Sequence, residues 1–184
     1  MKTFYTADRR AWRRWLRANR KNKSEVWLVY YRKGTGKARL AYNDAVEEAL
    51  CFGWIDSTVR KLDDQRFVQK FSPRKPKSPY SQANKERLKK LAADGKIAKD
   101  VLATLGTALT AEAPFPKDIL AAIKADRLAW VNFQNFSESY RRIRIAFIEG
   151  ARRRPGEFRK RLHYFIKMTA ANRQFGFGGI EKYY

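Results

Sequence analysis

The residues best suited to chemistry lie in one stretch, Trp54 to Asn84, where an aspartate, several cations and polar side chains follow one another closely. The basic loop over residues 74–78 leads into a predicted helix, so it brings cations to the free N–H groups of a helix start. Both features favour a negatively charged ligand. The candidate anion- or ligand-binding residues are Trp54, Asp56, Ser57, Arg60, Arg74, Lys75, Lys77, Ser78, Tyr80 and Asn84.

A structural role for the same residues is the alternative. Asp56 would then pair with Arg60 or Arg74 and hold the loop against a neighbouring hairpin. The stretch offers no evident nucleophile or general base, so the catalytic residues, if any, are unknown. An enzyme that acts on a small anionic substrate through the Asp56/Arg74 region therefore remains a secondary hypothesis.

Metal and cofactor chemistry has little support in the sequence. Cys51 is the only cysteine and His163 the only histidine. One residue of each kind cannot complete a zinc site of the usual Cys/His type, and no glycine-rich phosphate loop is present. We therefore expect no metal and no cofactor. A Cys51/His163 nucleophile pair is conceivable, but a free cysteine within a helix more often packs as a small hydrophobe.

The net charge of +23 points to polyanionic partners, with nucleic acid the first to consider. The charge is distributed in blocks, because residues 41–59 hold four acidic residues and no Lys or Arg, while basic blocks flank them on both sides. A diffuse solvated basic surface is the alternative, since charge alone binds without specificity. The candidate nucleic-acid-binding residues share one face of the first predicted helix and are Arg10, Arg13, Arg14 and Arg17.

The predicted strands are short and lie in the first half of the chain. Residues 26–31 are rich in β-branched and aromatic residues, as expected of a strand. Residues 54–62 and 67–72 read as the two strands of a hairpin that Pro73 ends. Residues 38–40 are expected to form a short partner strand.

The predicted helices provide the remaining framework. The first covers residues 6–19, and the second begins with Asn43 or Asp44 as N-cap and ends at Gly53. A third begins at Ser78 or Ser81 and runs to Ala93, before Gly95. The residues that we expect in the core are Trp12, Trp15, Trp27, Leu50 and Phe147.

The C-terminal part shows only helical periodicity. After a proline-containing boundary at residues 111–116, four helical segments are predicted: 117–125, 128–136, 139–153 and 157–174. We predict an α+β fold with a small antiparallel sheet and flanking helices, followed by a C-terminal helical bundle. The predicted domains are residues 1–110, an α+β signature domain, and residues 111–184, a helical domain.

Residues 45–57, Ala-Val-Glu-Glu-Ala-Leu-Cys-Phe-Gly-Trp-Ile-Asp-Ser, form a dense pattern that Pro73–Ser78, Ser81 and Asn84 extend. This pattern resembles the core signature of the YdeI/OmpD-associated family, also called the bacteriocin-protection family. The helical tail resembles the C-terminal part of the same family. The resemblance implies no assigned reaction. It places in the family pattern Trp54, Asp56, Ser57, Arg74 and Ser78, with Tyr80 where the family has tryptophan.

The N-terminal residues contain no apolar run of signal-peptide length, and no stretch approaches a membrane span. We therefore expect a cytoplasmic protein without a transmembrane segment, for which a porin partner is not expected. The favoured function is a non-enzymatic basic binding protein for a polyanion such as nucleic acid. The alternative is a protection factor against stress or antimicrobial peptides. It would act indirectly, since a basic protein repels cationic peptides.

Overall fold

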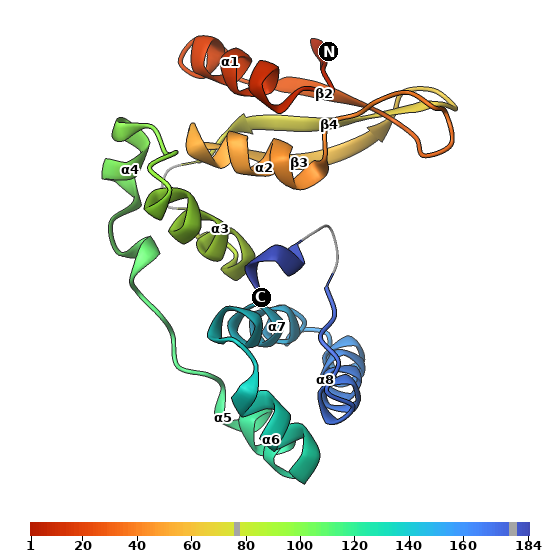
Figure 1. The fold of residues 1–184 in the computed structure, drawn as a ribbon, viewed down its shortest axis with the longest axis vertical. Helices are drawn as coiled ribbons and strands as arrows, with labels where there is room; N and C mark the ends of the chain where they lie inside the picture. Colours follow the sequence, from red (N-terminus) through yellow and green to blue (C-terminus); the bar gives the residue numbers. More distant parts are fainter. Residues whose placement is uncertain (76–77, 177–179) are drawn as a thin grey trace. The chain divides into compact units, whose positions relative to one another are not determined.

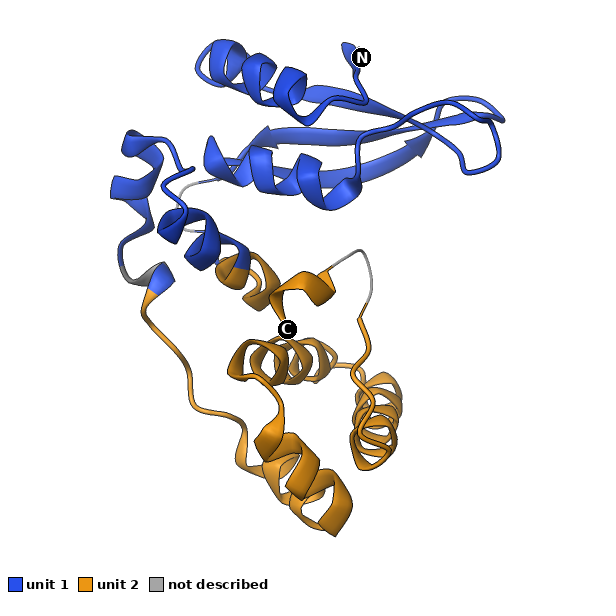
Figure 2. Cartoon of the chain, viewed as in Figure 1, with its two compact units in different colours: residues 1–79, 87–109 blue, residues 80–86, 110–184 orange. Residues whose placement is uncertain are grey.

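A computed structural model describes residues 1–75, 78–176 and 180–184 of the chain (Figure 1). The chain divides into two compact units (Figure 2). Unit 1 consists of Met1–Pro79 and Arg87–Leu109, and unit 2 consists of Tyr80–Glu86 and Thr110–Tyr184.

Unit 1 is built on a four-stranded sheet with strand order β1-β2-β4-β3. The strands are β1 (Thr3–Tyr5), β2 (Val26–Tyr31), β3 (Trp54–Lys61) and β4 (Arg66–Pro73). The β3–β4 hairpin and β2 are confirmed. The predicted antiparallel sheet is in fact mixed, because β1 runs parallel to β2, and residues 38–40 form no strand.

Two helices of unit 1, α1 (Arg9–Asn19) and α2 (Tyr42–Cys51), pack against each other and against the sheet (Figure 1). Trp12 joins the three elements: its indole N–H donates to the Ala45 carbonyl at 3.0 Å, and its ring meets Phe71 of β4 edge-on at 5.3 Å. The carboxylate of Asp8 caps α1 by accepting from the backbone N–H groups of Arg10 and Ala11.

The start of α2 differs from the prediction. Its N-cap is Ala41, which offers no side-chain acceptor, whereas Asn43 and Asp44 both lie inside the helix. Asp44 is engaged by Arg9 instead, so an ion pair between two helices has replaced a local cap. Gly53 follows the helix with a φ of +73°, a left-handed conformation that glycine adopts without strain, as its predicted role as a stop requires.

The helix α3 (Gln82–Ala93) begins one residue after Ser81, whose hydroxyl accepts from the Asn84 backbone N–H at 3.3 Å. Of the two predicted starts, Ser81 is therefore correct and Ser78 is wrong. Two short elements that the sequence analysis missed follow in unit 1: helix α4 (Lys99–Leu105) and a 3₁₀ turn, η1 (Gly106–Leu109).

Unit 2 contains α5 (Lys117–Lys124), α6 (Arg127–Asn135), α7 (Glu138–Glu149), α8 (Pro155–Ala170) and the 3₁₀ turn η2 (Ile180–Tyr183). The four predicted C-terminal helices are thus confirmed, with ends shifted by a few residues. Their apolar faces meet in one core, in which Phe133 of α6 packs edge-on against Phe165 of α8 at 6.2 Å.

The prediction that five residues are mostly buried is confirmed. Trp12, Trp27 and Leu50 are at most 4% exposed. Trp15 and Phe147 are less completely buried. Phe147 is covered on one side by a guanidinium group rather than by an apolar side chain, since Arg161 lies 3.8 Å above its ring.

Candidate functional site

The tryptophan of the predicted ligand site belongs to the core. Trp54 is 1% exposed, its ring packs edge-on against Trp15 at 5.8 Å, and its indole N–H donates to the Arg20 carbonyl at 3.4 Å. A side chain so enclosed cannot serve as a stacking platform for a ligand. Its place in the sequence pattern therefore reflects packing between α1 and β3.

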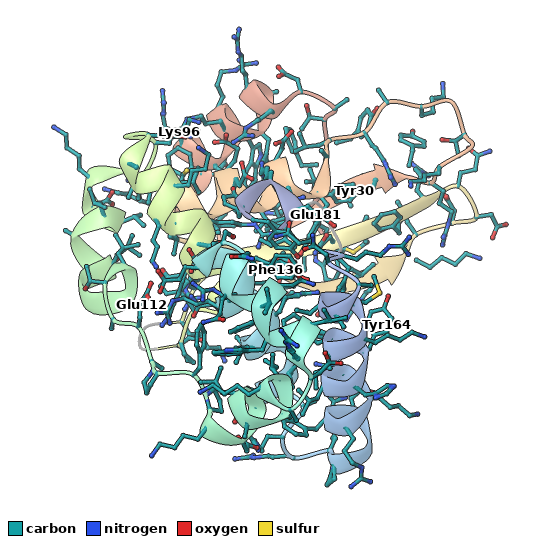
Figure 3. The ribbon with its side chains drawn as sticks, turned by 60° about the horizontal axis from the view of Figure 1, so that its bottom comes forward. Tyr30, Lys96, Glu112, Phe136, Tyr164 and Glu181 are labelled. Carbon is teal, nitrogen blue, oxygen red and sulfur yellow. The ribbon has the colours of Figure 1, made fainter. Side chains whose placement is uncertain are left out.

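Asp56 lies in a small polar cluster on the sheet. Its Oδ2 accepts from the Tyr42 hydroxyl at 2.9 Å and from the Gln69 amide at 2.6 Å. Burial and the charge of Asp56 raise the pKa of Tyr42 to about 12. The hydroxyl of Tyr30, also close to this carboxylate, is buried and has no hydrogen-bond partner among the described residues; burial raises its pKa. Figure 3 labels Tyr30 on the sheet.

The structural alternative, in which Asp56 pairs with Arg60 or Arg74, is wrong in its partners, because within the described parts of the chain Asp56 bonds to Tyr42 and Gln69. Arg60 extends over the ring of Trp27 at 4.9 Å. Arg74 donates to the Ser78 carbonyl and so closes its own loop.

The other members of the predicted ligand site are dispersed. Ser57 and Lys75 are exposed in unit 1, and Lys77 lies outside the described residues. Tyr80 and Asn84 belong to unit 2. An anion site formed by all ten residues thus stays a prediction, and its members do not form a single cluster within unit 1.

The acidic block of residues 41–59 has a partner that the sequence analysis did not foresee. Arg9 of α1 donates to three carboxylates of α2, at 2.5 Å to Asp44, 3.0 Å to Glu47 and 2.6 Å to Glu48. Arg13 adds a 2.6 Å bond to Glu48. Glu47 and Glu48 are each only 3% exposed, and their hydrogen bonds and charges raise the pKa of Arg9 although burial opposes this. We call these five residues the α1–α2 ion-pair cluster.

One cleft of unit 1 gathers cations from both ends of the unit's sequence. It has a volume of about 450 Å³ and lies between the end of α1 and the segment that leads into α4. Lys96, labelled in Figure 3, lies on that segment. Among the described residues that line it, none is acidic. The cations of this basic cleft are Arg13, Arg17, Arg20, Lys21, Lys96 and Lys99.

Half of the cations in the basic cleft are held in place. The guanidinium groups of Arg13 and Arg20 lie over the Phe52 ring, 5.1 and 5.7 Å from its centre. Arg13 also donates to the Lys96 carbonyl at 2.7 Å. Arg20 pairs with Asp100 at 2.8 Å, and Lys96 pairs with Asp94 at 2.9 Å.

The other half is available to a ligand. Arg17, Lys21 and Lys99 make no ion pair to any residue that the structure describes. Two of the four predicted nucleic-acid-binding arginines, Arg13 and Arg17, line this cleft.

The remaining two predicted arginines, Arg10 and Arg14, are exposed on α1 outside the lining of the cleft. Lys96 and Lys99 were missed, because nothing local in the sequence links them to α1.

The nucleophile pair finds no support. Cys51 is fully buried in unit 1, where burial, with Glu48 adding to it, raises the pKa of its thiol to about 11. His163 is exposed on α8 of unit 2. The described residues contain no group of three or more His, Cys, Asp or Glu that could hold a metal, and no described helix is long and apolar enough to cross a membrane.

Two family models match different parts of the chain. A family model described as a domain of unknown function (DUF8412) matches residues 4–104, which include the dense pattern of residues 45–57. A second model, described as bacteriocin-protection, YdeI or OmpD-associated, matches residues 112–172. No curated protein and no solved structure matches the chain. The chain therefore belongs to the DUF8412 family through its first part, and its helical part matches the bacteriocin-protection, YdeI or OmpD-associated family model.

Proposed function

We propose that the protein is a non-enzymatic binding protein for a polyanion, with nucleic acid as the partner and the basic cleft as the centre of the binding surface. The observation that carries the proposal is that the basic cleft is lined by six cations and, among the described residues, by no carboxylate. Such a concave arrangement concentrates positive potential and attracts phosphate groups.

The two kinds of cation in the basic cleft have different parts in this proposal. Arg13 and Arg20 are fixed against Phe52 and by their other bonds, so they define the wall of the cleft. Arg17, Lys21 and Lys99 have no ion-pair partner among the described residues and can turn toward phosphates at little cost in desolvation. Each phosphate that they neutralise releases condensed counterions, which favours binding at low salt.

Binding through this surface has little sequence preference. Phe52 is 6% exposed, so its ring is not open for bases to stack on it. Cations that contact phosphates fix position but do not read bases. The expected dissociation constant is therefore that of non-specific binding, about 10⁻⁴ to 10⁻⁶ M at physiological salt.

The proposal is tested by measuring the affinity for a fluorescent single-stranded oligonucleotide by anisotropy over a series of salt concentrations. The cleft variant carries Arg17→Gln, Lys21→Gln and Lys99→Gln. Single strands contribute about 0.7 to the log–log salt slope for each neutralised phosphate, so this variant should lose about 2 units of slope.

The matched control removes the same charge from exposed positions of unit 1 outside the cleft. The control substitutions are Lys2→Gln, Lys33→Gln and Lys37→Gln. If the control loses as much slope as the cleft variant, the binding belongs to a diffuse basic coat and the assignment to the cleft fails.

A further inference from the structure

A second cavity lies in unit 2 and is of a different kind from the basic cleft. It encloses about 240 Å³ between α7, α8 and the segment that follows α8. Pockets for drug-sized ligands start at about 300 Å³, so this one is suited to a molecule with a single ring. Five of the side chains that line it are apolar or aromatic: Phe147, Ile148, Tyr164, Phe165 and Phe175.

The aromatic rings form walls rather than a closed core. Tyr164, labelled on α8 in Figure 3, is 49% exposed, and its ring meets Phe175 edge-on at 4.9 Å. Phe165 is 1% exposed at the bottom. A planar ring that enters the pocket could pack against this Tyr164–Phe175 pair, with the edge or face contacts that aromatic pairs prefer.

The charged residues that line the pocket give it a net positive charge. Arg144 is 2% exposed, with its guanidinium 5.2 Å from the Phe147 ring and 4.9 Å from the Phe175 ring. Arg161 stacks on Phe147 at 3.8 Å and pairs with Glu157 at 2.7 Å. That pairing accounts for the one acidic residue among the described lining residues, and it lowers the pKa of Glu157.

Lys160 completes the lining and makes no ion pair with a residue in the described part of the chain. The pocket therefore has three cations against one carboxylate, and its two guanidinium groups are already pressed against rings. An uncharged aromatic ligand would use the walls alone, and a cationic one would be repelled by Arg144 and Lys160. A ligand with one ring and one negative charge would use both the walls and the charge.

We infer that this pocket binds a small aromatic carboxylate, with the ring against the Tyr164–Phe175 pair and the carboxylate toward Lys160 and Arg144. This site is separate from the basic cleft of unit 1, and the inference does not depend on the proposed nucleic-acid binding. The same pocket lies largely within residues 112–172, so it is built mainly from the YdeI/OmpD-associated segment.

The experiment titrates the full-length ¹⁵N-labelled protein with sodium benzoate and follows the amide resonances by NMR. Benzamide has the same ring without the charge, benzylamine reverses the charge, and acetate has the charge without the ring. We expect benzoate to shift the amides of α8 and of the Phe175 segment. It should bind at least about threefold more tightly than acetate, given the usual size of an aromatic contact, and about twofold or more tightly than benzamide and benzylamine, which lack the negative charge.

Two pairs of variants locate the site. Tyr164→Ala should weaken benzoate binding at least about threefold, whereas His163→Ala, at the exposed neighbouring position, should leave it unchanged. Lys160→Gln should weaken it about twofold or more, whereas Arg159→Gln removes the same charge outside the lining and should not.

Three results would overturn the inference. The first is the absence of saturation below about 10 mM benzoate, an affinity too weak for a formed site. The second is shifts spread over the basic surface that acetate reproduces. The third is an equal loss of affinity in the Lys160→Gln and Arg159→Gln variants.

Discussion

Replacing Glu48 by glutamine tests whether the α1–α2 ion-pair cluster holds unit 1 together. Glu48 is 3% exposed and receives two short bonds, from the Arg9 Nε and the Arg13 Nη1, each at 2.6 Å. Glutamine keeps the shape but has one acceptor oxygen in place of two. Its NH₂ group would face a guanidinium, which is also a donor. One arginine of the pair would therefore lose its acceptor inside the fold.

The expected loss in the free energy of unfolding depends on how far Glu48 and its two arginine partners are buried. Breaking a buried ion pair by removing one partner costs about 3–5 kcal/mol, because the remaining charge is left uncompensated. Here the side chains of Arg9 and Arg13 are 33% and 28% exposed, so water can partly solvate them. Arg9 also keeps Asp44 and Glu47. We therefore expect Glu48→Gln to lower the free energy of unfolding by about 2–3 kcal/mol.

The assay is urea unfolding at pH 7 followed by tryptophan fluorescence, to which unit 1 contributes four of the five tryptophans. With a slope of about 1–3 kcal/mol per molar urea, the midpoint should fall by about 1 M or more without a change of slope. The control is Asp44→Asn, at a side chain that is 32% exposed and bonds to the same Arg9, for which we expect less than about 1 kcal/mol. Equal losses in the two variants would refute a special role for the buried carboxylate.

Three further predictions concern pH, packing and the basic loop. Burial raises the pKa of the Cys51 thiol from about 9 to about 11, so the folded chain holds that proton more tightly than the unfolded chain. Stability should therefore fall as pH rises from 9 to 11, and Cys51→Ala should reduce this fall by about 2 kcal/mol in urea titrations at the two pH values. Trp12→Ala, at a fully buried residue, should cost about 3–5 kcal/mol, and an unchanged denaturation midpoint would show that α1 lies outside the core. Reversing Arg74, Lys75 and Lys77 to glutamate should weaken oligonucleotide binding more than the same reversal at the control residues Lys2, Lys33 and Lys37. An equal loss of affinity in the anisotropy titrations would show that the loop is only part of a diffuse basic surface.

Elements whose signals are local were predicted well. The β3–β4 hairpin combines aromatic and β-branched residues with a polar turn, and the helices of unit 2 have apolar stripes that repeat over several turns. The strand β1 could not be predicted in this way. It has three residues, and its only support is a parallel pairing of Thr3–Tyr5 with Trp27–Val29, which a local pattern does not encode. The helix α4 has seven residues, too few for a repeating apolar stripe.

The candidate site was predicted only in part, for a related reason. Arginines on one face of α1 indicated a cationic surface, but they could not indicate that Arg13 would turn to Glu48 while Arg17 stayed available. The cleft is completed by Lys96 and Lys99, about eighty residues further along the chain, and only the fold brings them to α1. Trp54 shows a different error: it was assigned to the ligand site because it stands out in the sequence pattern, but it is buried in the core.

The alternation of basic and acidic blocks along the first hundred residues has a physical explanation in the ion-pair cluster. A chain with 41 Lys and Arg against 18 Asp and Glu repels itself when it becomes compact. Three of its carboxylates, Asp44, Glu47 and Glu48, face α1, where all three pair with Arg9 and Glu48 also pairs with Arg13. The acidic block thus stabilises the contact between two helices from within. Because these carboxylates are engaged there, they do not offset the positive charge of Arg17, Lys21 and Lys99, and the positive charge of the basic cleft depends on the same arrangement that stabilises the unit.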